Sequence, residues 1–244
     1  MSTKNRNNHH KFPHPEAHGG RTGTKLNWLR AAVLGANDGI VSIAGLVVGI
    51  AGATNSITVI LAAGIAGIIA GAISMAAGEY VSVSSSRDTE RALLQKEREE
   101  LEKYPEQELL ELAHIYEHKG LSQKTALQVA KELTDHDPYA AHFDAELQID
   151  PNNLTNPWHA AIASAGSFLV GAIIPLVAIS IPLGSLRIPF TFCSVVVALV
   201  ITGTISAKIG GASVRTAIIR VVSGGALAMA ATYGIGRLFG VKGI

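Results

Sequence analysis

The sequence predicts an all-α membrane protein with five transmembrane helices and a three-helix cytoplasmic insertion between the second and third. Five apolar segments are each close to the roughly 20 residues that a helix needs to cross a bilayer. Charged residues are concentrated in one stretch between them, from Arg87 to Asp150. The 244-residue chain is 48% apolar but only 5% aromatic, and it contains 25 glycines. This composition suits close-packed membrane helices better than a large soluble core.

The chain divides into a polar tail, two spans, a charged insertion and three further spans. Residues 1–27 are polar and rich in Gly, Pro and His, which predicts a disordered tail. A His-rich tract can bind metal, although a solvated tail is the simpler interpretation. We place the first two spans within 28–86, a Glu-rich helical metal-binding domain within 87–157, and three more spans within 158–244. The histidines of the tail are His9, His10, His14 and His18.

The predicted spans cover residues 29–53, 57–83, 159–181, 188–209 and 215–239. Pro175 lies inside the third span and is expected to kink it. Basic residues flank alternate connections, and the last connection is flanked by Lys208, Arg215 and Arg220. Because cytoplasmic loops carry the excess of Lys and Arg, the N-terminus and the insertion should be cytoplasmic. We expect an integral multi-pass protein of the cell (plasma or inner) membrane or of an endomembrane.

Several features argue against other classes of protein. The single cysteine, Cys193, allows no intramolecular disulfide and no cysteine metal cluster. The polar N-terminal stretch does not resemble a cleavable signal peptide. The sequence contains no nucleotide-binding motif, so an ion gradient or a metal gradient is the expected energy source. We expect no organic cofactor and no nucleic-acid partner.

Two of the predicted spans carry residues that are costly to bury. Asp38 lies in the first span, and Met75 and Glu79 lie one turn apart in the second. An ionisable residue within a span is a functional-site hypothesis, because burying a carboxylate in hydrocarbon costs several kcal/mol. Asp38 and Met75 lie about nine and about eight residues from the cytoplasmic ends of their spans, at depths of roughly 14 and 12 Å. They therefore predict, with Glu79, a polar column leading in from the cytoplasm. Further oxygen ligands could come from Asn37, Ser42 and Ser74.

The insertion is predicted to form three helices. The first continues the second span to about Tyr104. The second begins at Pro105, a favoured first helical residue, and ends near Lys119. The third follows Ser122, a good N-cap, and is interrupted at Pro138.

Glutamates fall on the apolar side of the first of these helices. The apolar stripe consists of Leu93, Leu94, Leu101 and Tyr104. On a helical wheel, Glu90, Glu97 and Glu100 lie inside it. Inward carboxylates without an evident basic partner on the same stripe indicate a bound cation.

The other two helices give weaker signals. Glu108 and Glu111 share a face, but it is not the apolar face of their helix. Glu111-x-x-His114 has the spacing found in di-iron bundles, and a solvated face explains it equally well. His142 and Glu146 lie one turn apart in the third helix. Oxygen and imidazole ligands without thiolate suit Fe²⁺, Mn²⁺ or Zn²⁺ more than Cu⁺. The candidate metal ligands are Glu97, Glu100, Glu108, Glu111, His142 and Glu146.

Three stretches of the sequence resemble the vacuolar iron transporter family. They are GANDGIVS, GAISMAAGEYVSVSSSRDTE and NPWHAAIASAGSFLVGAIIPL, with the Glu-rich insertion between the last two. The resemblance covers nearly everything after the tail. It implies five spans, a homodimer with the transport path at the dimer interface, and export of Fe²⁺ from the cytoplasm in exchange for protons.

The resemblance also implies roles for particular residues. Asp38 and Met75 match the transport-site positions of the family, and Glu79 matches the glutamate below them. In the insertion, the matching carboxylate ligands are Glu97, Glu100, Glu108, Glu111 and Glu146. Plant members have methionines before the last of these, where this chain has His142 and Phe143.

The sequence therefore predicts a proton-coupled transporter, and not an enzyme, that moves Fe²⁺ or Mn²⁺ out of the cytoplasm for detoxification or storage. Its expected partners are divalent metal ions, protons, the lipid bilayer and a second copy of the chain. One alternative is a membrane-anchored ferritin-like di-iron oxidase, which would need two ExxH motifs and four helices. The other is a metal sensor that does not transport, which would leave Asp38 unexplained.

Overall fold

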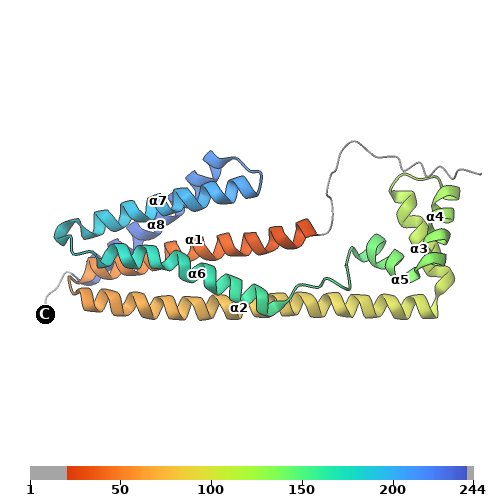
Figure 1. The fold of residues 1–244 in the computed structure, drawn as a ribbon, viewed down its shortest axis with the longest axis horizontal. Coiled ribbons are helices and arrows are strands. Elements are labelled where there is room, and N and C mark those ends of the chain that lie inside the picture. Colours follow the sequence, from red (N-terminus) through yellow and green to blue (C-terminus); the bar gives the residue numbers. More distant parts are fainter. Residues whose placement is uncertain (1–20, 241–244) are drawn as a thin grey trace, which may run out of the picture.

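The computed structural model describes residues 21–240, with side chains from residue 32 onward. The described chain consists of helices joined by short connections (Figure 1). In chain order they are α1 (Arg21–Ala53), α2 (Ile57–Lys103), α3 (Pro105–His118), α4 (Gln123–His136), α5 (Pro138–His142), the π-helical turn η1 (Phe143–Leu147), α6 (Pro157–Ser180), the 3₁₀ turn η2 (Gly184–Leu186), α7 (Arg187–Ile209) and α8 (Val214–Gly240).

Five of these helices, α1, α2, α6, α7 and α8, are long and apolar enough to cross a membrane. They coincide with the five apolar segments that the sequence predicted as spans. The surface of the bundle is also apolar: Ile65, Ile69 and Ile73 on one face of α2 are 50%, 56% and 65% exposed. Such a face is suited to contact with lipid or with another membrane helix, because a contiguous row of isoleucines exposed to water is unfavourable.

The expected tail differs in one respect. α1 begins at Arg21, so residues 21–27 are helical and do not belong to a disordered tail. The four histidines of the tail lie outside the described residues.

α1 is the central helix of the bundle, because it contacts α2, α6, α7 and α8. One of its faces packs with α7 and α8 in a core of Ile40, Ala44, Val48, Val195, Ala198, Leu199 and Met229. The other packs with α2 and α6 in a core of Ile43, Val47, Ile60, Ala72, Phe168, Ala172 and Ile179. The side chains are mostly small or β-branched, so the helices approach closely, as is usual in membrane bundles.

Glycines allow the closest approach of α1 to α6. A Cβ on Gly171 would overlap the carbonyl oxygen of Ala36, and one on Gly39 would overlap that of Phe168. Neither obstacle is a flexible side chain, so a larger residue forces the two helices apart.

We expect Gly171→Ala to lower the thermal midpoint of the purified protein substantially, because the added methyl group meets α1 backbone. The matched control is Gly166→Ala in the same helix, where a Cβ would meet nothing within 4 Å. That substitution should leave the midpoint unchanged or raise it slightly, since Ala favours helix more than Gly does. Equal midpoints for the two variants would contradict the packing described here.

α2 is one continuous helix of 47 residues, about 70 Å long at 1.5 Å per residue. Its first part belongs to the bundle, and its second part runs beyond it to carry α3, α4 and α5 at its far end (Figure 1). This outlying unit has its own small core of Leu112, Ala113, Ala130 and Ala145.

The insertion contains more elements than the sequence predicted. After Pro138 the chain forms α5 and then η1, which ends at Gln148 in a left-handed conformation with φ of 54°. π-Helical turns are uncommon and often occur at functional sites. This one carries Glu146 and follows His142 directly.

Candidate metal centre

Four side chains of the insertion converge on one buried point. Glu97 comes from α2, Glu108 from α3, His142 from α5 and Glu146 from η1. One ligand atom from each lies within 4.8 Å of the others. Glu97, Glu108 and His142 are 3%, 7% and 0% exposed, while the side chain of Glu146 is 29% exposed. The group is therefore reached from solvent on the side of Glu146.

His142 Nδ1 is the centre of the group. It lies 2.9 Å from Glu97 Oε1, 3.7 Å from Glu146 Oε2 and 3.9 Å from Glu108 Oε2. Two atoms that bind the same ion at about 2.0–2.2 Å lie about 3.0 Å apart at right angles and about 3.5 Å apart in a tetrahedron. The distances from Nδ1 match a shared ion after adjustments of a few tenths of an ångström.

Hydrogen bonding does not explain why these groups are buried together. Glu97 Oε1 and both ring nitrogens of His142 are buried and have no hydrogen-bond partner among the described residues. The 2.9 Å contact between Glu97 and His142 is thus close but poorly aligned for a hydrogen bond. Buried polar groups are normally satisfied, and a metal ion would satisfy Glu97 Oε1 and Nδ1 of His142.

Burial and mutual repulsion disfavour the charged form of the carboxyl groups. Burial, followed by the charges of Glu146 and Glu108, raises the pKa of Glu97 from 4.5 to about 7. Burial, followed by the charge of Glu111, also raises the pKa of Glu108. The pKa of His142 is lowered by burial, which favours the neutral imidazole that binds metal. A divalent cation would reverse this cost by compensating several carboxylates at once.

Local sequence signals bring the four ligands together. Tyr104 ends α2, and Pro105 begins α3 immediately, so Glu97 and Glu108 lie on either side of a sharp corner. Asp137 caps α5, where its Oδ1 accepts a hydrogen bond of 3.0 Å from Ala140 N. Ser122 caps α4 as predicted, and its side chain accepts a bond from Thr125 N.

Two of the six predicted ligands lie outside the group of four. Glu100 forms an ion pair of 2.8 Å with Lys96 on the same helix. Glu111 is exposed, although its charge still raises the pKa values of Glu97 and Glu108. The helical wheel was wrong about Glu108, which is buried, because α3 is covered by α2 as well as by α4 and η1.

His114 does not form a site with Glu111. Its Nε2 lies 3.2 Å from His118 Nε2, one turn further along α3, and both residues are exposed. The Glu111-x-x-His114 spacing therefore does not produce half of a di-iron site in this structure.

The residues predicted for the transport path lie in the bundle. Asp38 is exposed on α1, and its stripe continues with the exposed residues Leu34 and Ser42. Met75 is half-buried on α2 against the core that contains Phe168. Glu79 is half-buried on α2, one turn nearer the insertion. Within residues 32–240 no hydrogen bond or ion pair links Asp38 to Met75 or Glu79.

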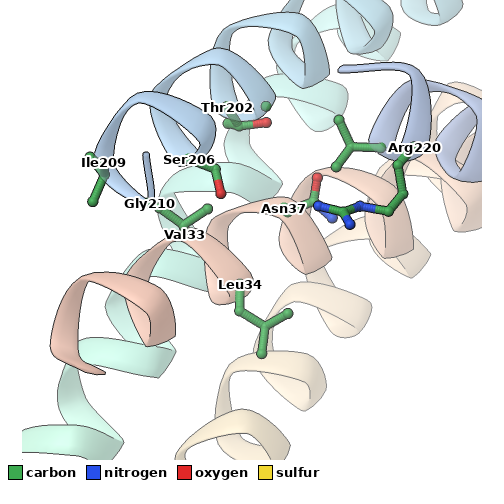
Figure 2. Close-up of a pocket in the computed structure, with 10 residues that line it drawn as sticks. Val33, Leu34, Asn37, Thr202, Ser206, Ile209, Gly210 and Arg220 are labelled. Carbon is green, nitrogen blue, oxygen red and sulfur yellow. The ribbon is translucent and has the colours of Figure 1, made fainter. Parts of the chain in front are cut away.

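A cavity of about 440 Å³ lies between α1, α7 and α8, where Asn37 lines it from α1 (Figure 2). Figure 2 shows Arg220 extending from α8 toward Asn37, whose Oδ1 is buried without a hydrogen-bond partner. Thr202 and Ser206 of α7 also line the cavity. A guanidinium group repels divalent cations, so the charge of this cavity does not suit a metal path. From the sequence, Arg220 was interpreted only as a basic residue flanking the last connection, and its position at this cavity was not predicted.

The pKa of Glu97 leads to a test of stability. A carboxyl group whose pKa is higher in the folded state stabilises the protein less as pH rises from 4.5 to about 7. The metal-free Glu97→Gln variant should therefore melt several degrees above the wild type at about pH 8, with little difference at about pH 5. Glu102→Gln, at an exposed position of the same helix, is the control. Identical melting curves for wild type and Glu97→Gln at the higher pH would show that the buried charge is not costly.

The fold and the cluster define a multi-pass membrane protein with a candidate metal centre outside its spans. Residues 29–237 match the family model described as the VIT family, and the chain belongs to that family. It is 43% identical over 230 residues to a vacuolar iron transporter of Acanthamoeba castellanii, covering 91% of this chain and 82% of that protein. It is 35% identical over 217 residues to vacuolar iron transporter homolog 2.1 of Arabidopsis thaliana, covering 88% and 83%. The resemblance inferred from the sequence is confirmed.

Proposed function

We propose that this chain is a proton-coupled exporter that moves Fe²⁺ or Mn²⁺ out of the cytoplasm and works as a homodimer. The observation that carries the proposal is the buried group in which three carboxylates surround His142 Nδ1. Oxygen and imidazole donors suit these ions. The names of the relatives, vacuolar iron transporters, support iron as the cargo.

In this proposal the insertion collects metal on the cytoplasmic side. Lys and Arg are dense in the chain before the first span and after the second, and the connection between these two spans contains none. This distribution favours a cytoplasmic insertion. Glu146, the most exposed of the four ligands, is the point of entry for a hydrated ion. The ion then passes to the bundle, where Asp38, Met75 and Glu79 provide two carboxylates and a thioether.

The exposure of Asp38 supports the homodimer. A carboxylate on the lipid-facing surface of a span is costly, and such residues normally face a protein interior or a water-filled path. In the single chain, Asp38 has no such cover. A second copy packed against this side of α1 would enclose Asp38 in a path between the two protomers.

Protons and metal ions would compete for the same carboxylates. A proton or a divalent ion can each compensate the charge of Asp38 within the membrane, and metal binding requires the deprotonated form. Alternate occupation of one site by the two cations is sufficient to couple metal export to proton entry.

The test is a flux assay with the full-length protein in proteoliposomes under an imposed pH difference. Fe²⁺ and Mn²⁺ should drive proton movement, whereas Ca²⁺, which prefers more oxygen ligands, should not. Absence of flux for every metal would reject transport and favour a sensor. Oxygen consumption on addition of Fe²⁺ would instead favour the oxidase.

A further inference from the structure

The extension of α2 carries a second constellation, which is built from arginines and lies apart from the metal ligands. Arg87, Arg91 and Arg98 line a cavity of about 420 Å³ between α2 and the loop that precedes α6. The rest of the lining consists of Leu94, Gln95, Pro151, Asn152 and Leu154.

Helix geometry directs the three arginines to the same side. They are spaced by four and then seven residues, so at about 100° per residue their Cα positions fall within roughly 40° of one another. The loop residues Pro151, Asn152 and Leu154 complete the lining. The cavity is thus a cleft with basic groups along one wall.

The charge of this cleft is uncompensated. None of the residues that line it is acidic, and no ion pair joins these arginines to a carboxylate among the described side chains. Arg87 Nε is also buried without a hydrogen-bond partner, and a buried donor without an acceptor is costly. Asp150, next to Pro151 in the chain, is engaged with the loop itself, where its Oδ1 accepts a hydrogen bond of 2.9 Å from Asn152 N.

One end of the cleft lies close to the expected boundary of the membrane. The rings of Tyr80 of α2 and Trp158 of α6 pack against each other at an angle of 51°, with their centroids 4.7 Å apart, and such aromatic residues are enriched at the membrane–water interface. Arg87, at the near end of the cleft, follows Tyr80 by seven residues, or about 10 Å along the helix, whereas Arg98 lies about 27 Å from Tyr80. The headgroup layer extends about 5–8 Å beyond the hydrocarbon on each side, so a phosphorylated headgroup that projects from the layer can enter the cleft at its Arg87 end.

We propose that this cleft binds a phosphate-bearing anion, namely the multiply phosphorylated headgroup of an acidic membrane lipid. Guanidinium groups match phosphate oxygens in charge and in bidentate geometry. Basic pockets beside spanning helices are suited to such headgroups. A soluble polyphosphorylated anion offers the same chemistry, and the experiment separates the two sources. This site goes beyond the proposed transport function, because it uses none of the metal ligands.

The experiment measures binding to the full-length protein in lipid nanodiscs or detergent. The probes are a short-chain phosphatidylinositol bisphosphate, the corresponding soluble inositol phosphate, inorganic phosphate and phosphatidylcholine. The test variant is Arg87→Gln/Arg91→Gln/Arg98→Gln. The matched control removes the same charge from exposed positions of the insertion, with Lys119→Gln/Lys124→Gln/Lys131→Gln.

The wild type and the lysine control should bind the bisphosphate lipid alike, and the arginine variant at least tenfold more weakly. Tighter binding of the lipid than of the soluble headgroup identifies the membrane as the source, and equal binding identifies a soluble anion. Because Arg98 lies over the ring of Phe143 at 5.7 Å, the triple variant could fold poorly. In that case the single variant Arg91→Gln, at an exposed position, should weaken binding of the bisphosphate lipid several-fold. Equal loss in the arginine and lysine variants, or no binding by the wild type, would overturn the proposal.

Discussion

Asp38→Asn should abolish metal-driven proton movement in proteoliposomes, reducing it at least tenfold toward the rate of protein-free liposomes. The amide retains the size of the carboxylate but carries no charge, so it cannot alternate between a divalent ion and a proton. The Asp38 carboxylate lies within a spanning helix, where a charge without a binding partner costs several kcal/mol. Binding a divalent ion or a proton removes that cost. Fluorescence of an entrapped pH indicator after addition of Fe²⁺ is the measurement.

The control for this variant is Asp88→Asn, which removes an exposed carboxylate from α2 beyond the predicted membrane span. It should transport like the wild type. Asp38→Asn should also retain the metal affinity of the insertion, because Asp38 belongs to the bundle. Unchanged flux in Asp38→Asn would refute the role assigned to this residue, even if the insertion bound metal as expected.

The second large effect concerns the affinity of the buried cluster for metal. His142→Gln should weaken metal binding by the full-length protein by about 100-fold, since an amide is a poor replacement for the imidazole at the centre of the group. Calorimetry with Mn²⁺ or Zn²⁺ measures the change. His136→Gln, at an exposed histidine of α4, is the control and should bind like the wild type.

The same cluster should bind metal in a pH-dependent way. The pKa of Glu97 is raised to about 7, so below that pH the metal must displace a proton. Affinity should therefore fall by up to about tenfold per pH unit below 7 and level off above it. His142 adds little near neutrality, because burial lowers its pKa. Glu97→Gln should bind more weakly but with a flatter profile, and a wild-type affinity that does not vary between about pH 6 and 8 would contradict this account.

These measurements also separate the ligands that the structure brings together from those that only the family resemblance implies. Glu100 is paired with Lys96, and Glu111 is exposed. Replacing either with Gln should reduce affinity less than replacing Glu97 or His142, since their charges act on the cluster from outside it. If Glu100→Gln proves as damaging as Glu97→Gln, the cluster must rearrange when metal binds.

The spans, the long second helix and the residues that begin the next helices were all predictable from the sequence. Runs of about 20 apolar residues have few alternatives in a bilayer, where every backbone group must be hydrogen-bonded within a helix. Pro105 and Ser122 act locally, through a fixed φ and a capping oxygen, so they determine helix starts whatever surrounds them. The inward position of Glu97 was also predictable, because a helical wheel depends only on the periodicity of one helix.

Only the tertiary structure decided which glutamates meet. Glu108 is buried because α2 covers α3 in addition to α4 and η1, and no pattern within the sequence of α3 indicates that α2 packs there. His142 and Glu146 meet Glu97 through a π-helical turn that the sequence did not predict. The arginine cleft likewise depends on a loop from far along the chain. Periodicity and capping are properties of short segments, whereas a site made by several elements depends on how they pack against one another.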